Sequence, residues 1–313
     1  MTELGVAAVG ECMLELSGGE SGNWRMGHAG DTFNTLWTLR ALTPKTIPAD
    51  YVSAFGDDPF SADQKAFFAQ SGIGTAASPV IAGRRPGLYA ITLDGAERSF
   101  TYWRADSAAR CLADDPASLG KSLQNRKLVY FSGITLAILE PPARRTLIEA
   151  LRQARKADSR IAFDPNYRPR LWASSQEARA ANDAALAVTD IALPTFPDEQ
   201  QLYGDADPRE TTARLARAGV RECIVKNGSE PTVLAGGGEM ATVSACRVTH
   251  PVDTTGAGDS FNGAYLAARL AGDAPQDAVR RAHRVAAAVI QVHGALAPFD
   301  MLCKAFENEA EEN

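Results

Sequence analysis

The sequence lacks the features that would place it in a bilayer, in an oxidising compartment or on nucleic acid. No apolar run in it is long enough to span a membrane. Its formal net charge of −6 gives no broad basic field for nucleic acid or an anionic membrane. The five cysteines are odd in number and contain no Cys-x-x-Cys pair, which argues against a disulfide framework or a zinc site. The first residues, MTELGV, also lack the basic region of a secretion signal, so we expect a cytoplasmic protein.

What remains is an ordinary globular composition with an alternating pattern of short apolar runs and helical stretches. The 313 residues are 45% hydrophobic and 22% charged, which suits one large α/β domain with an appendage, or two domains. Strands are expected at 6–9, 52–55, 128–132, 161–164, 191–194, 223–226 and 232–235. Helices are expected at 32–42, 59–70, 141–156, 175–188, 208–218, 256–270 and 275–292. This order predicts a mostly parallel sheet with helices on both faces.

Two segments break the alternation, 14–30 and 88–104. Both have strand and turn character, with turns expected at Gly18-Gly19 and Asp94-Gly95. We expect a small antiparallel sheet standing off the main domain; two separate surface hairpins are the alternative. The predicted division is a core of 1–13, 31–86 and 107–313 and a β-lid of 14–30 and 87–106, with a disordered acidic tail at 307–313.

The run DTTGAGDSFNG, residues 253–263, carries the most specific chemistry. Its glycines allow a tight turn that leads into a helix, where free backbone N–H groups and the helix dipole can hold a phosphate. A carboxylate at Asp259 would repel that phosphate, unless its task is to take a proton from an attacking hydroxyl. The alternative is that Asp259 only caps the helix and the glycines only form a turn.

The whole string resembles the C-terminal signature of the ribokinase-like (PfkB-type) carbohydrate kinases. That resemblance implies a doubly wound α/β fold with a β-lid. It also implies that Asp259 is the catalytic base and that Gly256, Ala257 and Gly258 form the anion hole, with ATP as phosphoryl donor.

A second glycine-rich stretch, GHAGDTFN at 27–34, resembles the N-terminal signature of the same family. Ala29-Gly30 stands where the family usually has two glycines, and Asn34 matches the family's asparagine. The resemblance implies that Gly30, Asp31 and Asn34 contact sugar hydroxyls. Asp31 could instead be a plain N-cap, or serve both purposes.

Two arginines point to an anionic substrate. Arg104 ends the run YWR, where strand alternation places it on the same face as Tyr102. Arg168 lies in DPNYRPRLW, on a stiff loop after a central strand, where open α/β sheets bind ligands. A guanidinium fork matches a carboxylate. Together with GDTFN these motifs are similar to the family's kinases for a sugar acid, 2-dehydro-3-deoxy-D-gluconate, which implies that Tyr89 and Tyr102 also line the substrate site.

One motif departs from the family pattern. The usual Asn-x-x-Glu that organises Mg²⁺ through water is replaced here by Thr195-Phe196-Pro197-Asp198-Glu199. Mg²⁺ needs only one or two carboxylates, so Asp198 or Glu199 could still serve. Further nucleotide contacts are expected at Asn166, Arg168, Lys226 and Gly228, beside the anion hole. A plain hairpin turn at 226–228 is the alternative for the last two.

The expected activity is ATP- and Mg²⁺-dependent phosphorylation of a primary hydroxyl of 2-dehydro-3-deoxy-D-gluconate, giving the 6-phosphate. Two alternatives stay open: a related kinase for fructose or 5-dehydro-2-deoxygluconate, and a non-catalytic sugar sensor on the same fold. The apolar face expected for the lid strands predicts a homodimer formed through the lid.

Overall fold

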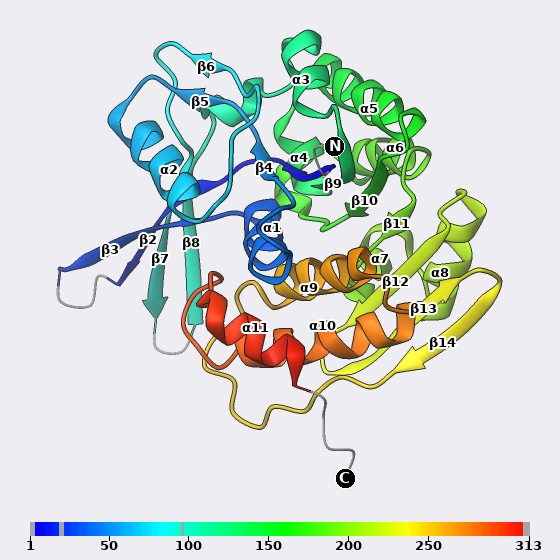
Figure 1. Ribbon diagram of the computed structural model, residues 1–313. Coiled ribbons are helices and arrows are strands. Elements are labelled where there is room, and N and C mark those ends of the chain that lie inside the picture. The colour runs from blue at the N-terminus through cyan, green and yellow to red at the C-terminus, as the bar shows by residue number, and fades with distance from the viewer. Residues whose placement is uncertain (1–3, 19–21, 95–96, 309–313) are drawn as a thin grey trace.

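The structure is a computed structural model that describes residues 4–18, 22–94 and 97–308. Its core is an eight-stranded sheet in the order β14-β13-β12-β11-β10-β9-β1-β4 (Figure 1). The strands are β1 Gly5–Val9, β4 Ala49–Val52, β9 Arg126–Ser132, β10 Arg160–Asp164, β11 Ile191–Ala192, β12 Glu222–Asn227, β13 Glu230–Gly236 and β14 Glu239–Val243. All neighbours are parallel except β13, which is antiparallel to both β12 and β14.

Helices cover both faces of this sheet, because its central strands are apolar on both sides. One face packs against α1 Asp31–Leu42, α2 Pro59–Gln70, α9 Ala257–Ala271, α10 Pro275–Val289 and α11 Phe299–Glu307. The other packs against α3 Pro116–Ser122, α4 Gly133–Ile138, α5 Pro141–Lys156, α6 Ser175–Leu186 and α8 Pro208–Arg217. Alternate residues of β9 show the division, since Tyr130 belongs to the first core and Phe131 to the second. The predicted doubly wound α/β fold is confirmed.

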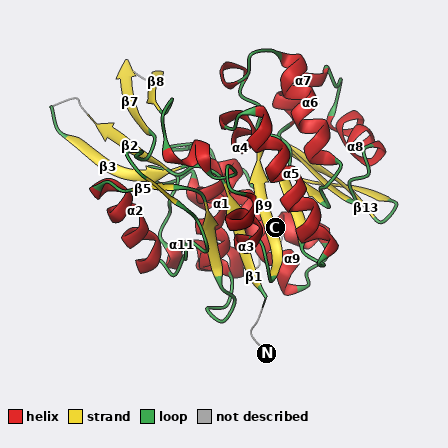
Figure 2. Ribbon diagram, turned by 90° about the horizontal axis from the view of Figure 1, so that it is seen from above, coloured by secondary structure: helices red, strands yellow, loops and turns green. Residues whose placement is uncertain are grey.

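The lid is a four-stranded sheet in the order β3-β2-β7-β8 that projects from one side of the core (Figures 1 and 2). Its strands are β2 Met13–Gly18, β3 Trp24–Ala29, β7 Leu88–Asp94 and β8 Glu97–Trp103. It differs from the expected antiparallel sheet in one respect: the central pair, β2 and β7, is parallel. Both strands leave the core in the same direction, and each returns through its own antiparallel partner.

The ends of several predicted segments lie outside the described residues. Of the two expected lid turns, Gly19 and Gly95 are not described, and the same holds for 309–313 of the expected disordered tail. The expected tail starts at residue 307, but in the structure Glu307 is still helical, as the last residue of α11.

Helices α2 and α8 each begin directly after a capping aspartate. Asp58 and Asp207 each accept hydrogen bonds from the first backbone N–H groups of α2 and α8, and a proline follows each cap. Helices α3, α4 and α11 and strand β14 were not predicted from the sequence, nor were α7 Phe196–Tyr203 and the two-residue β6 Val80–Ile81. The strand expected at 52–55 overlaps the end of β4 at Val52 and the start of β5 Phe55–Gly56. Most of the unpredicted elements are short, and their stability comes from packing on neighbouring elements, as for α11 on α1 and α10, more than from a periodic pattern of their own.

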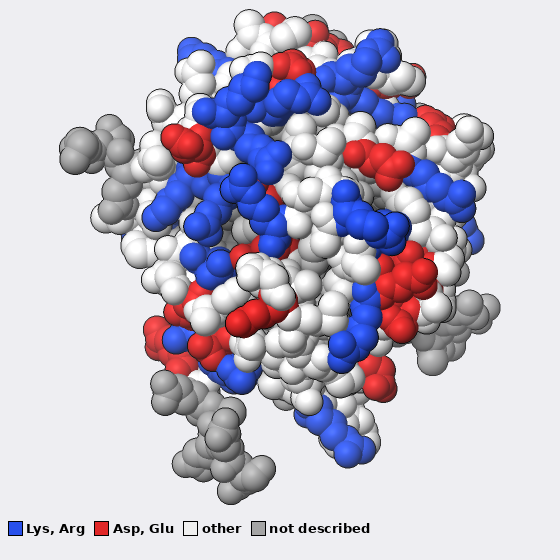
Figure 3. All heavy atoms as spheres, turned by 90° about the vertical axis from the view of Figure 1, so that its right-hand side faces the viewer, with Lys and Arg blue, Asp and Glu red and all other residues white. Residues whose placement is uncertain are grey.

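The surface carries both signs of charge. On the face shown in Figure 3, Lys and Arg side chains gather mainly in the upper half, with Asp and Glu among them. Among the helices that the structure describes, none combines the length and the apolar character needed to cross a membrane.

Candidate active site

A cavity of about 500 Å³ opens at the carboxyl ends of the central strands. This is the edge at which open α/β sheets bind ligands. Its polar lining is Asp31, Asp164, Asn166, Arg168, Thr195, Asp198, Lys226, Asn227, Gly228, Thr232, Thr254, Thr255, Asp259 and His283, with Gly256, Ala257 and Gly258 between them. The structure therefore brings the predicted base, anion hole and nucleotide contacts into one space.

The predicted anion hole lies at the first turn of α9. Gly256 is the N-cap residue, with φ of 75°, and as a glycine it has no side chain to cap the helix. The Ala257 N–H donates to the Thr254 carbonyl oxygen at 3.3 Å, so the N–H groups of Gly258 and Asp259 are the ones best placed for a ligand. A Cβ at this position would lie 2.6 Å from the Ala295 Cβ, so a side chain does not fit here. The Lys226 ammonium lies 3.7 Å from the position that a Cβ of Gly258 would occupy. A lysine charge and a helix N-terminus thus face the same space, as an anion requires.

Asp259 stands in the first turn of α9, half-buried, with its carboxylate fixed across the site. The Asn34 side-chain amide donates to Asp259 Oδ2 at 2.8 Å. Burial, and next the negative charge of Asp31, raise the pKa of Asp259 to about 7. The hydrogen bond from Asn34 opposes this shift. A carboxylate tuned in this way can exchange a proton near neutral pH, as a general base must.

Asp31 begins α1 and is held by a residue from the opposite side of the cavity. The Asn166 amide donates to Asp31 Oδ2 at 2.9 Å, and the Asn166 backbone N–H donates to Asp164 Oδ1 at 3.0 Å. Asn166 adopts φ of 36°, a conformation that asparagine tolerates better than most residues. Burial raises the pKa of Asp31. Asn166, which is predicted to contact ATP, lines the cavity, and its side chain also orients a carboxylate that is predicted to bind sugar.

Beneath the cavity lies a buried polar network around Lys226. Its ammonium donates to Asp164 Oδ2 at 2.8 Å and to Asn262 Oδ1 at 2.9 Å. The Asn262 amide in turn donates to Asp164 Oδ2 at 2.7 Å and contacts the Tyr130 hydroxyl at 3.1 Å. Sequence analysis missed Asp164, Asn262 and Tyr130. Asp164 could have been found, because it ends a central apolar strand directly before Asn166.

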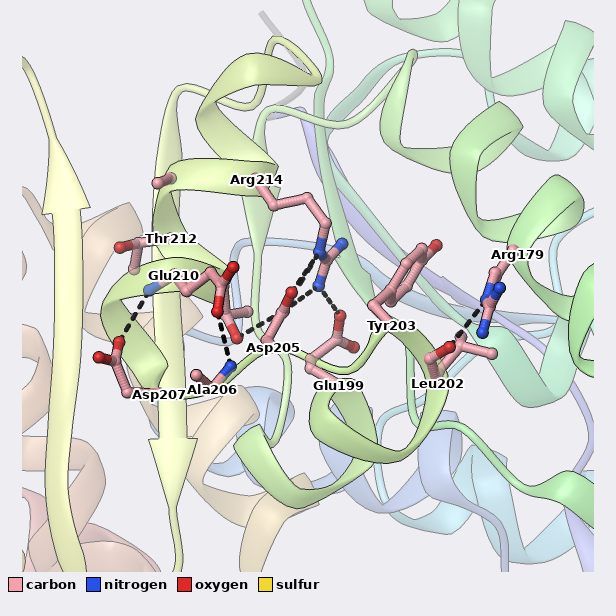
Figure 4. Close-up of polar contacts among 12 residues, drawn as sticks. Arg179, Glu199, Leu202, Tyr203, Asp205, Ala206, Asp207, Glu210, Thr212 and Arg214 are labelled. Carbon is pink, nitrogen blue, oxygen red and sulfur yellow. Dashed lines mark hydrogen bonds and ion pairs between the residues drawn. The ribbon is translucent and has the colours of Figure 1, made fainter.

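The two predicted metal carboxylates lie in different environments. Asp198 lines the cavity and accepts a hydrogen bond from Arg168 at 3.1 Å, and burial raises its pKa. Glu199 points away from it into an ion pair with Arg214 at 2.5 Å, and Arg214 also binds Asp205 at 2.7 Å (Figure 4). Burial raises the pKa of Glu199 to about 7 despite this arginine.

No cluster of three or more His, Cys, Asp or Glu within the described ranges could hold a metal on its own. An ion at this site would therefore depend on ligands supplied by its phosphates and by water.

The predicted lid residues form a separate group. Tyr89 donates a hydrogen bond to Glu15, and its ring centroid lies 5.6 Å from that of Tyr102, which is 51% exposed. Arg104 forms an ion pair with Glu11, a residue that sequence analysis missed. In the described part of the chain, none of these side chains contributes to the 500 Å³ cavity. The predicted site residues thus fall into two groups: one around the cavity, which we call the phosphate end, and one on the lid, which we call the lid end.

Gly30 and Asn34 lie between the two ends. The Gly30 N–H donates to Asn34 Oδ1 at 3.3 Å, while the Asn34 amide holds Asp259. Gly30 is the residue that leads from the lid into α1. The predicted base Asp259 is therefore linked by two hydrogen bonds to Gly30, the residue that leads out of the lid.

Curated proteins resemble this chain over nearly its whole length. It is 39% identical to the 2-dehydro-3-deoxygluconokinase of Dickeya dadantii over 309 residues, covering 96% of this chain and 99% of the relative. It is also 39% identical to the protein of the same name from Escherichia coli K12 over 301 residues, covering 94% and 97%.

Solved structures show the same fold. A structure from E. coli, described as a candidate ribokinase II in complex with ATP and Mg²⁺, superposes with a TM-score of 0.82 at 22% identity, covering 96% of this chain and 98% of that one. The model of the pfkB family carbohydrate kinases matches residues 4–301. The chain therefore belongs to the pfkB family of carbohydrate kinases.

Proposed function

We propose that this protein is a sugar-acid kinase that transfers the γ-phosphoryl group of ATP to the 6-hydroxyl of 2-dehydro-3-deoxy-D-gluconate. The observation that carries the proposal is the arrangement at the phosphate end. Asp259, with a pKa of about 7, lies in the first turn of the uncapped helix α9 and beside Lys226. A proton acceptor and an anion site thus meet where a hydroxyl and a phosphate would react.

In the proposed reaction Asp259 accepts the proton of the attacking hydroxyl. Asn34 keeps the carboxylate oriented through its hydrogen bond. The N–H groups that follow Gly256, together with the Lys226 ammonium, stabilise the negative charge on the phosphates. The buried hydrogen bonds from Lys226 to Asp164 and Asn262 fix the ammonium before the substrate arrives, so little reorganisation is needed during transfer.

Two features support the acid as the acceptor. Arg168 lines the cavity with half of its side chain exposed, and Arg104 lies at the end of the lid strand that carries Tyr102. Both can offer a charged hydrogen bond to a carboxylate. The chemical identity of the acid follows the relatives of 38–39% identity, which carry the name of this kinase.

The cavity also suits Mg²⁺ with ATP. Asp198 would hold the ion through water, because it is the predicted metal carboxylate that lines the cavity. Glu199 has no place in this proposal, since its side chain is not among those that line the cavity and pairs with Arg214 instead. When bound, Mg²⁺ neutralises charge on the phosphates and orients them for transfer.

We further propose that two copies pair through the lid, in the cytoplasm. Trp24, Met26 and Trp103 are 45%, 49% and 57% exposed. In the strand register Met26 lies opposite Leu16 and Trp103 opposite Leu88, so these side chains share one face of the lid. A second lid would cover them. All five cysteines are free thiols, which fits a reducing compartment.

A coupled ADP-release assay tests the activity. With ATP and Mg²⁺, the protein should turn over 2-dehydro-3-deoxy-D-gluconate in preference to fructose and 5-dehydro-2-deoxygluconate. Phosphorus NMR of the product should show a phosphate ester at the 6-position. Equal or faster turnover of fructose would overturn the substrate, and tight sugar binding without turnover with any of the three would overturn the enzyme.

A further inference from the structure

Glu11 lies where the chain crosses between the core and the lid. The chain crosses between core and lid four times. Residues 10–12 connect β1 to β2 of the lid and Gly30 connects β3 of the lid to α1; Gly87 precedes β7 of the lid and Arg104 follows β8. The Glu11 carbonyl oxygen packs so closely on Gly30 that a Cβ there would overlap it. A Cβ at Gly87 would lie 2.6 Å from Glu11 Oε1. Arg104 Nη2 pairs with Glu11 Oε2. Glu11 therefore contacts all three of the other crossings, at Gly30, Gly87 and Arg104.

The Glu11–Arg104 ion pair is buried but incompletely hydrogen-bonded. The side chains are 1% and 12% exposed. Among the residues that the structure describes, neither Glu11 Oε1 nor Arg104 Nε has a hydrogen-bond partner. Buried charged groups normally use their hydrogen-bonding atoms, because leaving one unpaired is costly. This pair therefore retains donor and acceptor capacity at the lid crossings.

We propose that Glu11 is a positioning residue that holds the guanidinium of Arg104 for the carboxylate of the sugar acid, and that the bound acid completes the hydrogen bonding of the pair: its carboxylate accepts from Arg104 Nε and one of its hydroxyls donates to Glu11 Oε1. This inference rests on the proposed function. A guanidinium offers five N–H donors in one plane, so a carboxylate on one of its edges fixes the plane and leaves other donors for a second carboxylate.

The surroundings of Glu11 support a role in the site. The backbone of Glu11 packs on Gly30, the Gly30 N–H donates to Asn34, and Asn34 holds the base Asp259. Glu11 is thus connected by direct contacts both to the predicted acid-binding arginine and to the anchor of the base. A residue in this position can set how the predicted acid-binding guanidinium lies relative to the predicted base.

Glu11→Gln tests the proposal, because it keeps the shape and removes the charge. We expect the KM for the sugar acid to rise about tenfold or more, as for a lost charged hydrogen bond, while the KM for ATP stays within about twofold. The matched control is Glu222→Gln, which alters the Glu222–Arg269 pair, joined at 2.8 Å with 15% and 18% exposure, at the start of β12. This control should leave both KM values unchanged.

A double variant separates positioning from a general effect on the fold. If Glu11 acts through Arg104, then the KM for the sugar acid of the Glu11→Gln/Arg104→Ala double variant should be less than about twofold higher than that of Arg104→Ala alone. Glu11→Asp serves if the Gln variant does not fold, because it keeps the charge and withdraws the carboxylate; we expect the same selective rise in KM.

Three results would overturn the inference. A variant of Glu11 that lowers kcat equally for acid and neutral sugars, with KM unchanged, would make the residue purely structural. Multiplicative losses in the double variant would show that Glu11 does not act through Arg104. If the wild-type protein itself preferred a neutral sugar, the proposed function would fail and the inference with it. The wild-type comparison therefore shows which of the two has failed.

Discussion

The phosphate end and the lid end of the site are built differently. At the phosphate end, Lys226, Asp164 and Asn262 satisfy one another in the core, and Asn34 holds Asp259. At the lid end, the Glu11–Arg104 pair leaves polar atoms unpaired among the described residues, and Tyr102 is half exposed. One end is organised before any ligand binds, while the other still has bonding capacity for a substrate.

This difference follows from where each end lies in the fold. The phosphate end uses residues at the carboxyl ends of β10 and β12 and in the first turn of α9, all supported by a close-packed core. The lid end depends on four chain crossings and a sheet with little core of its own, the small cluster of Met13, Ala29 and Tyr89. We therefore expect changes at Asp259 and Lys226 to affect kcat, and changes at the two arginines and on the lid surface to affect the KM for the acid and assembly.

The largest effect is expected from Asp259→Asn. The amide retains the shape but cannot accept a proton at neutral pH, so kcat should fall about 10²–10⁴-fold. The melting temperature should stay close to that of the wild type, because the change relieves a like-charge contact with Asp31. A variant that keeps turnover within a few-fold of the wild type would remove Asp259 as the base.

Next in size are Arg104→Ala and Arg168→Ala. Each lost charged hydrogen bond should raise the KM for the sugar acid by about 10–150-fold, with a much smaller change for ATP. If both arginines bind the same carboxylate, their losses should not multiply. The values come from initial rates at saturating ATP. Equal rises in both KM values for Arg104→Ala would instead indicate a structural role for that arginine.

Helix bounds and candidate site residues could be predicted from the sequence, but the contacts between residues far apart in the chain could not. Helices α2 and α5 have the predicted bounds, because prolines mark their starts and their patterns are long. The roles of Asp259 and Arg104 remain predictions that only the variants test. Their contacts could not be predicted, since Asn34 and Asp259 are 225 positions apart and Glu11 and Arg104 are 93 apart. Only folding brings such pairs together.

For Glu199, a local motif suggested a role, and a distant residue that the motif does not include determines its contact. A motif position identified it as a metal carboxylate, but it pairs with Arg214, a partly exposed arginine on α8 that no local sequence pattern connects to it. Adjacent residues on a helix point in different directions, so Asp198 can face the cavity while Glu199 does not.

A smaller effect is expected in the pH profile. Asp259 must be deprotonated to act, and its pKa is raised to about 7, so kcat/KM should fall as the pH drops through about 7. Asp31→Asn removes the charge that helps to raise this pKa, so the acid limb should move to lower pH even if overall activity falls. Asp198→Asn, in the same cavity, should leave the limb in place. A limb that does not move in Asp31→Asn would contradict the coupling.

The smallest effect on catalysis is expected from the lid surface. Trp103→Glu places a charge in the proposed dimer contact and should shift sedimentation toward the monomer. Phe60→Glu, at a residue on α2 that is 47% exposed, is the matched control and should not. A wild-type protein that is monomeric and fully active at micromolar concentration would contradict the dimer.

The most direct test compares the sugar acid with the alcohol formed when its C1 carboxylate is reduced. This substrate pair differs only at the group that Arg104 of the lid and Arg168 of the cavity are proposed to bind, and the reacting hydroxyl is the same. The account predicts that the wild type strongly prefers the acid in kcat/KM and that the Arg104→Ala/Arg168→Ala double variant hardly distinguishes the two while still turning over the alcohol. A double variant that keeps the wild-type preference would contradict it.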